Sequence, residues 1–199
     1  TLGGSEFVSG LTLSGTLAGS GHTLSANRTT LQSGANVLAN LGPGTLTILG
    51  SSTLTGSSAA SIVNLEGGTL TLSSGERLSD LADLTLASGT TLTLNGDETV
   101  TSVTLAGSVN GSGSLRASNY TLNGAVVDAN LGGGLLRAIG INQLNGQSAA
   151  TAVDVISGTL TLGSAGRFTA LRVVTVQDPA SLRLGGAETF SALAGGGVV

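Results

Sequence analysis

The 199-residue chain contains no cysteine, methionine, tryptophan or lysine, and it has a single histidine. The absence of cysteine excludes a disulfide framework and a cysteine-ligated zinc site. One histidine gives little basis for a histidine-rich metal site or a Ser–His–Asp triad. We therefore expect neither a metal nor another cofactor.

Charge and aromatic side chains are also scarce. Charged residues make up 9% of the chain, aromatic residues make up 2%, and the formal net charge is −4. An acidic balance argues against nucleic acid and anionic membranes as partners. No apolar run reaches 18 residues, so the sequence predicts no membrane insertion. A hydrophobic content of 40% is too high for a disordered chain.

Repetition dominates what is present, since Gly, Leu, Thr and Ser together fill 117 of the 199 positions. The string GTLTL at 68–72 recurs at 158–162, which is an offset of 90 residues, and LNGDE at 94–98 resembles LGGAE at 184–188 and LGGSE at 2–6. The sequence therefore predicts slightly more than two 90-residue units, approximately 2–93, 94–183 and 184–199. We expect the segment to come from a longer rod.

A short period inside the unit predicts strands. Leucine or valine alternates with threonine or serine in pieces such as 69–72 and 91–94, and glycine-rich turns separate them. The fold class expected is all-β, a right-handed parallel β-helix (β-solenoid) of about nine or ten coils in one monomeric rod. A β-sandwich is the second choice. The residues expected to point inward are Leu70, Leu72, Leu92, Leu94, Leu160, Leu162, Val174, Val176, Leu182 and Leu184.

Acidic pairs are the first candidates for catalysis. Asp80 with Asp83 and Asp97 with Glu98 are the only close pairs, and a glycosidase needs two carboxylates that converge across a cleft. In the second unit Ala170, Val173 and Ala187 replace the three aspartates. We therefore interpret these acids as solvated turn charges, and we expect no enzymatic activity and no catalytic residue.

Polar residues at matching positions favour structural roles. Glu6, Glu98 and Glu188 match one another, as do Arg77 and Arg167, and we expect these side chains to hydrogen-bond turn backbone. Asn40 and Asn130 match, as do Asn64 and Asp154, and we expect amide ladders at these positions.

The aromatic position is the weak candidate for ligand binding. His22-Thr23-Leu24 aligns with Tyr120-Thr121-Leu122 at an offset of 98, which predicts about eight extra residues near 26–33 in the first unit. An exposed Tyr120 could form a platform for a sugar, whereas a partly buried Tyr120 would only fill a corner of a coil.

Repeated Thr-x-Thr pieces raise a further alternative. They occur at 45–47, 69–71, 91–93 and 159–161, and regular ice-binding solenoids align such pairs in flat ranks. Here the spacing varies along the chain. Outward threonine favoured by strand propensity is the simpler interpretation.

The repeat style resembles a known group. Segments such as GTLTLSSGERLSDLADLTLASGTTLTLNGDETV at 68–100 look like repeats of filamentous-haemagglutinin-like large exoproteins of two-partner secretion, including CdrA-like biofilm-matrix adhesins. The resemblance covers essentially the whole chain and implies a secreted or cell-surface bacterial rod. It implies export through an outer-membrane transporter partner, and exopolysaccharide or a host or cell-surface glycan as a partner. It assigns no catalytic or ligand-binding residue.

An adhesin or biofilm-matrix rod is therefore the first functional hypothesis. The alternatives are an autotransporter-type passenger stalk without ligand contact, an ice-binding solenoid and a polysaccharide-degrading β-helix enzyme. The outward residues of each face distinguish them: regular threonine ranks favour ice, and a groove with acids, arginine and aromatics favours an enzyme. We expect saccharide contact by the rod to be weak and shallow.

Overall fold

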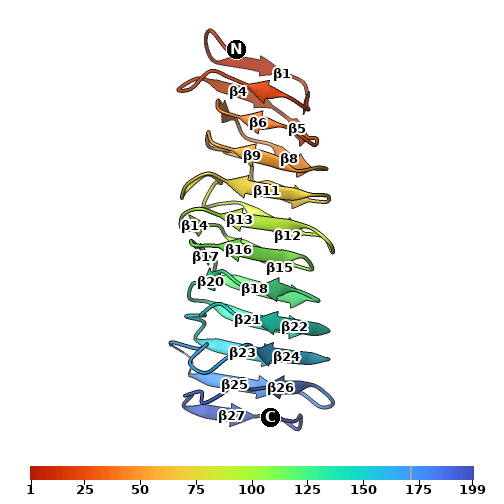
Figure 1. Cartoon of the computed structure of the whole chain (residues 1–199), viewed down its shortest axis with the longest axis vertical. Helices are drawn as coiled ribbons and strands as arrows, with labels where there is room; N and C mark the ends of the chain where they lie inside the picture. Colours follow the sequence, from red (N-terminus) through yellow and green to blue (C-terminus); the bar gives the residue numbers. More distant parts are fainter. Residues whose placement is uncertain (171) are drawn as a thin grey trace.

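The computed structural model describes residues 1–170 and 172–199 as a parallel β-solenoid of about ten turns, which confirms the predicted fold class. Figure 1 shows the turns stacked along one axis, with the two termini at opposite ends. No helix occurs among the described residues, so none of them forms a helix that could cross a membrane.

Two long parallel sheets run along the rod. The first long sheet has eleven strands: β2 (Leu11–Leu13), β5 (Arg28–Leu31), β8 (Thr45–Ile48), β10 (Ile62–Leu65), β12 (Asp83–Leu86), β15 (Ser102–Leu105), β18 (Asn119–Asn123), β21 (Leu135–Ile139), β23 (Ala152–Val155), β25 (Val173–Val176) and β27 (Ala192–Ala194). The second long sheet has ten: β3 (Thr16–Leu17), β6 (Asn36–Val37), β9 (Ser52–Leu54), β11 (Thr69–Leu72), β13 (Thr91–Leu94), β16 (Ser108–Gly111), β19 (Val126–Val127), β22 (Ile141–Leu144), β24 (Thr159–Leu162) and β26 (Ser181–Arg183).

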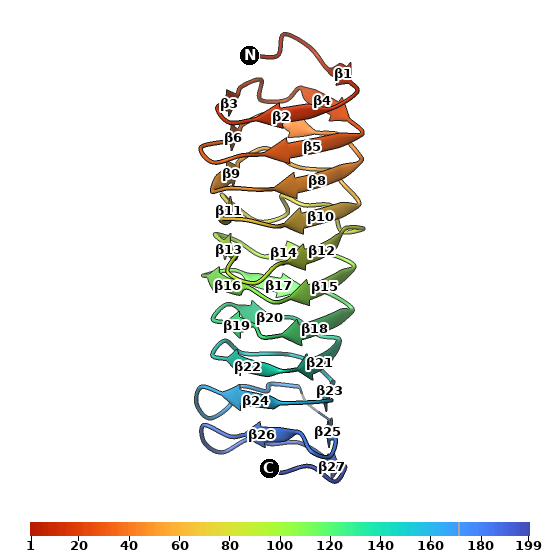
Figure 2. The same ribbon diagram turned by 90° about the vertical axis from the view of Figure 1, so that its right-hand side faces the viewer.

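A third face closes each turn with shorter strands. It holds two three-stranded sheets, β1 (Glu6–Val8), β4 (Thr23–Ala26) and β7 (Asn40–Leu41), then β14 (Glu98–Thr99), β17 (Ser114–Arg116) and β20 (Asn130–Leu131). Figure 2 shows β14, β17 and β20 on consecutive turns. Single bridges continue the face, from Leu41 to Ser58 and from Leu131 through Ser148 to Phe168.

The alternation of apolar and polar residues sets the core. In β11, Leu70 and Leu72 are fully buried, whereas Thr69 and Thr71 lie on the outer side. Register stacks Leu72 between Leu54 and Leu94, which makes one apolar column along the axis. Each buried leucine contributes about 2 kcal/mol by leaving water. The inward positions expected from the sequence are confirmed for all but one residue.

That exception is Leu184, which is 41% exposed rather than part of the column. Its counterpart Leu94 lies within β13, which pairs with a strand on each side. Leu184 instead follows β26, the edge strand of the second long sheet, and beyond β26 a single bridge from Ser181 to Val198 is all that continues the stack within the described residues. The side chain is therefore covered from one side only.

Turn length varies in a repeated pattern. Tyr120 and Leu136 are register partners 16 residues apart, whereas Val63 and Leu84 are 21 apart. A second 21-residue turn joins Val153 to Val174, and Val153 lies 90 residues after Val63. Because the extra residues form a loop on the third face, the sheets keep their register.

The alignment of His22 with Tyr120 is wrong. Arg28 pairs with Thr45, and Asn119 pairs with Leu135, so Thr29 occupies the place that Tyr120 has in the second unit. The offset there is 91 residues rather than 98. The first unit has one extra residue before Gly34, not about eight.

Some glycines are required by the close approach of successive turns. Gly56 and Gly146 occupy equivalent places after β9 and β22. A Cβ atom at Gly56 would overlap the carbonyl oxygen of Ala39, and one at Gly146 would overlap that of Ala129. Any larger residue would push the neighbouring turns apart.

Candidate functional site

Tyr120 is not a sugar platform. Its side chain is 0% exposed and lies in the core. The phenol oxygen accepts a hydrogen bond from the Ala117 backbone N–H at 2.7 Å and donates one to the Leu115 carbonyl at 3.0 Å. Burial raises the pKa of this phenol. The ligand-binding role considered for Tyr120 is therefore excluded by its buried position. The side chain instead stabilises the corner between β17 and β18 through its two hydrogen bonds.

We predict that Tyr120→Phe lowers the free energy of unfolding by about 2 kcal/mol, because Ala117 N–H and the Leu115 carbonyl lose a buried partner. Urea denaturation followed by circular dichroism measures the change. Thr121→Val, on the outer side of the same strand, is the control and should change stability by less than about 0.5 kcal/mol. Equal stabilities of Tyr120→Phe and the parent would contradict the structural role.

Glu98 is the one fully buried carboxyl group among the described residues, with an exposed fraction of 0%. It points inward from β14, and its carboxylate accepts backbone hydrogen bonds from Arg77 at 2.9 Å and from Leu78 at 2.7 Å. These two N–H groups belong to the long loop of the preceding turn, where no strand is available to pair with them. The Glu98 carboxylate therefore accepts the two hydrogen bonds that the carbonyl groups of a neighbouring strand would otherwise accept.

The same device recurs in the second unit. Glu188 accepts hydrogen bonds from the backbone of Arg167 and Phe168. The guanidinium groups of Arg77 and Arg167 donate to carbonyls of neighbouring turns, including Thr55 and Asn145. The expected role in holding turn backbone is confirmed for Glu98, Glu188 and the two arginines. It is not borne out for Glu6, which is exposed in the first turn and accepts no hydrogen bond from the described backbone.

Burial raises the pKa of Glu98 to about 7, although the N–H groups of Arg77 and Leu78 act in the opposite direction. The neighbouring Glu76 raises the pKa further, and Arg77 lowers it. A raised pKa in a carboxyl is a frequent mark of catalysis. Here the carboxyl is enclosed by protein and bonded to backbone, so the shift reflects a structural role.

The acid pairs do not converge. Asp97 and Glu98 are consecutive in β14 and its flank, and they point to opposite sides, with Asp97 exposed and Glu98 buried. Asp97 forms an ion pair with Arg116, and Asp83 accepts a hydrogen bond from Ser102. Asp80 lies exposed in the long loop. None of these pairs has the arrangement of two facing carboxyls that glycoside hydrolysis uses.

Asparagines cap the third face. The Oδ1 atoms of Asn40 and Asn130 accept the backbone N–H of the next turn, at Ser57 and Gln147 respectively. The predicted structural role is confirmed there, but the bonds run from amide to backbone and not along a ladder of amides. The amide ladder predicted at Asn64 is wrong, because register places this residue between two threonines.

Asn142 is a buried polar residue that the sequence analysis missed. Its Oδ1 accepts hydrogen bonds from Gly124 and Ala125, and its Nδ2 donates to Ile139. The equivalent residue in the first unit is Ser52, whose buried hydroxyl has no partner within the described residues. The difference between the units at this place was visible in the sequence as Ser against Asn.

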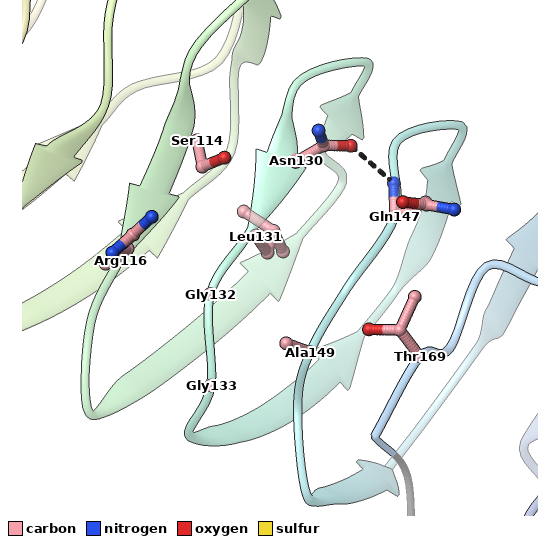
Figure 3. A pocket seen from close by; sticks show the side chains of 9 residues that line it. All are labelled: Ser114, Arg116, Asn130, Leu131, Gly132, Gly133, Gln147, Ala149 and Thr169. Carbon is pink, nitrogen blue, oxygen red and sulfur yellow. Dashed lines mark hydrogen bonds between the residues drawn. The ribbon is translucent and has the colours of Figure 1, made fainter.

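One hollow in the structure combines a charged side chain with amides. It lies on the third face and has a volume of about 350 Å³; we call it the trough. Figure 3 shows Arg116, Asn130 and Gln147 around it on three consecutive turns. Its lining consists of Ser114, Arg116, Asn130, Leu131, Gly132, Gly133, Gln147, Ala149 and Thr169.

Arg116 closes one end of the trough. Its guanidinium forms an ion pair with Asp97 at 2.7 Å, and both side chains are at least half exposed. Gly132 lies under the arginine stem, since a Cβ there would come within 2.8 Å of the Arg116 side chain. Gly133 leaves the floor open, because the nearest atom to a Cβ there is the Ala149 carbonyl oxygen at 3.8 Å.

In the first unit, the same face lacks the arginine and the open glycine floor of the trough. Register places Ser25 where the second unit has Arg116, at an offset of 91 residues, and Pro43 where it has Gly133, at an offset of 90. Ser5 replaces Asp97 and likewise accepts the backbone N–H of the next turn. The scaffold is shared, but the arginine and the open floor belong to the second unit.

Threonine ranks are present but short or mixed. In the second long sheet, Thr69 and Thr71 pair with Thr91 and Thr93, and the next strand offers Ser108 instead. The first long sheet carries one outward column: Thr12, Thr30, Thr47, Asn64, Thr85, Thr104, Thr121, Arg137, Asp154 and Thr175. The column beside it includes Arg28, Ile62 and Asp83. These faces lack the two flat threonine ranks of an ice-binding surface.

Within 1–170 and 172–199, no group of three His, Asp or Glu side chains is placed to hold a metal ion. Comparison of the chain with protein-family models, with curated proteins and with solved structures gives no match.

Proposed function

We propose that this chain is a structural rod segment of a secreted or cell-surface bacterial adhesin, acting in adhesion, aggregation or the biofilm matrix. The observation that carries the proposal is the uninterrupted solenoid, in which each turn rests on the next and the outer faces are hydroxyl-rich. Such a chain maintains an extended shape without disulfides or metal, and each turn can template the following one.

The surface chemistry supports weak, distributed contact. The outward columns offer threonine and serine hydroxyls, a few amides and few charges. Apart from the trough, a second hollow of about 500 Å³ lies over β6, β9 and β11 and is lined mainly by serine and threonine. Hydroxyl and amide groups hydrogen-bond to sugar hydroxyls, so a glycan of the matrix or of a cell surface is the proposed partner class.

The same features favour a rod over a polysaccharide-degrading enzyme. A hydrolase or lyase of this fold would need an acid pair facing a groove, together with a base or a stabilising cation. Asp97 is neutralised by Arg116, and Glu98 is buried behind it. The proposal therefore includes no catalytic step, and export through an outer-membrane partner belongs to it as an expectation from the repeat style.

A bead assay tests the function. Fluorescent beads coated with the chain are mixed with purified bacterial exopolysaccharides and with biofilm-forming cells, and aggregation is followed by light scattering and microscopy. Many weak contacts per bead should produce aggregation that a single soluble chain in excess inhibits poorly. Beads coated with a heat-unfolded sample are the control.

The outcomes separate the alternatives. Aggregation without release of reducing or unsaturated sugar ends supports the rod that contacts glycan. Absence of aggregation with every exopolysaccharide would favour the stalk that only spaces a distant domain. Release of sugar ends, abolished by Asp97→Asn, would overturn the proposal in favour of an enzyme, and thermal hysteresis with ice would overturn it in favour of ice binding.

A further inference from the structure

We propose that the trough of the second unit is a binding site for an uncharged saccharide chain lying along the axis of the rod. This inference rests on the proposed contact between the rod and glycan, and it names the site and the ligand class. The first unit has no equivalent site.

The trough presents hydrogen-bond donors in a row. The Asn130 Oδ1 is already used by Gln147 N–H, so its Nδ2 group is left pointing outward from the cap. Among the described residues, no hydrogen bond engages that Nδ2 group or the side-chain amide of Gln147. Arg116 adds further N–H donors beyond the one that binds Asp97. Sugar hydroxyl oxygens accept such bonds.

The row has the right direction for a polymer. Ser114, Asn130 and Gln147 occupy one register column on three consecutive turns, and Arg116 lies two residues further along its strand, beside Gly132 (Figure 3). Successive turns of a parallel sheet are about 4.8 Å apart, which is close to the length of one sugar ring in an extended chain. A chain along the axis therefore meets a new donor with each sugar, whereas a chain across the axis meets only one.

The floor is made for close approach. Gly133 and Ala149 carry at most one methyl group, so a sugar ring can lie against the backbone beside the Arg116 stem, which covers Gly132. In the first unit, Pro43 fills the place of Gly133 and the short Ser25 replaces the arginine wall. The two units share the fold of this face, so the difference in side chains is a difference in what the face can bind.

Electrostatics favours an uncharged ligand. Arg116 is the one charged residue in the lining, and Asp97 offsets it at 2.7 Å. A uronic acid chain would have to compete with Asp97 for the guanidinium, and the chain as a whole carries a net charge of −4. Binding should therefore depend little on salt.

Nuclear magnetic resonance of the ¹⁵N-labelled full chain tests the site. The probes are cellohexaose, laminarihexaose and mannohexaose as uncharged chains, and a mannuronate hexamer as the charged one. With at least one uncharged probe, we expect amide shifts at Gly132, Gly133 and Ala149 that saturate at millimolar concentration and persist at physiological salt. Absence of shifts at these residues with all three uncharged probes would overturn the proposal, as would tighter, salt-sensitive binding of the mannuronate hexamer.

Gly133→Pro is the decisive variant, because the first unit already accommodates Gly42-Pro43-Gly44 at this place. We expect it to keep the circular dichroism spectrum and to raise the dissociation constant by about tenfold or more, the equivalent of losing about 1.4 kcal/mol of binding. Arg116→Ala should raise it by about two- to tenfold, as for one lost hydrogen bond. Unchanged affinity of Gly133→Pro would overturn the site.

A reciprocal graft supplies the matched control. The quadruple variant Ser5→Asp, Ser25→Arg, Pro43→Gly, Ser57→Gln transfers the trough residues to the first unit, and new shifts should appear at Gly42 and Ala59. A folded graft without these shifts counts against the proposal. If Gly133→Pro binds like the parent in solution while bead aggregation persists, the trough is wrong and the proposed function stands.

Discussion

Leu72→Asp is expected to lower the free energy of unfolding by about 4 kcal/mol, because it places an unpaired carboxylate in the apolar column of the solenoid. Leu72 is fully buried in β11, between Leu54 and Leu94 of the adjacent turns. Neighbouring inward positions are apolar, so no partner is available to the new carboxylate. The change also removes a leucine from close-packed surroundings.

Thr71→Asp is the matched control one residue away. Thr71 points outward, and its register partners are Thr53 and Thr93. A carboxylate there stays in water, so the expected loss is under about 1 kcal/mol and reflects mainly strand propensity. Comparison of Leu72→Asp with Thr71→Asp therefore separates the effect of side-chain direction from the effect of position in the sequence.

Urea denaturation followed by far-ultraviolet circular dichroism measures both variants. Leu72→Ala extends the series in case the aspartate variant does not fold, and it should lose about 2 to 5 kcal/mol by leaving a cavity. Similar losses for Leu72→Asp and Thr71→Asp would contradict the inward assignment of Leu72. Amide hydrogen exchange measured in β9 and β13 would show how far the destabilisation spreads along the stack.

The inward residues could be predicted because a strand has a period of two. In β11 and β24 the pattern Thr-Leu-Thr-Leu allows only the leucine face to be buried. The alternation within the strand is enough to predict this. Leu184 fits the same pattern but fails, since burial also requires a neighbouring turn on both sides. Alternation indicates which way a side chain points, not what covers it.

Tyr120 shows why short matches mislead in such a chain. Both His22-Thr23-Leu24 and Thr29-Thr30-Leu31 match Tyr120-Thr121-Leu122 in two of three residues. Strand register selects Thr29. Register partners on successive turns are 16 to 22 residues apart, and this variation prevents the sequence alone from fixing the register.

The trough could not be predicted for the same reason. Its residues come from four turns, and the sequence does not show that Arg116, Gly133 and Thr169 share a face. One signal was present, however: Gly132-Gly133-Gly134 in the second unit stands opposite Gly42-Pro43-Gly44 in the first. A difference between copies that share a scaffold points to something other than folding.

Glu98 gives the second large effect, since the structure combines complete burial with two short backbone hydrogen bonds. Glu98→Ala leaves the N–H groups of Arg77 and Leu78 without an acceptor, and we expect a loss of about 3 kcal/mol at neutral pH. The long loop of the turn before β12 should then exchange its amide hydrogens faster than the sheets do.

The pH dependence follows from the raised pKa of Glu98. Its value in the folded chain is about 7, compared with an ordinary value of 4.5, so between these limits the folded state binds more protons than the unfolded state. The contribution of Glu98 to the free energy of unfolding is therefore fully present below pH 4.5 and is lost as the pH rises through 7. The shift corresponds to about 3 kcal/mol between these limits.

Glu98→Gln removes the titrating group while keeping its shape and one acceptor oxygen. We expect unfolding free energies measured by urea from pH 4.5 to pH 8 to fall less steeply for this variant than for the parent, with the difference centred between pH 5 and 7. Glu76 and Arg77 face the same carboxyl, so Glu76→Gln is tested beside it and should lower the upper limit of the transition. Parallel profiles for the parent and Glu98→Gln would show that the carboxyl stays charged in the core, with its two backbone hydrogen bonds outweighing burial.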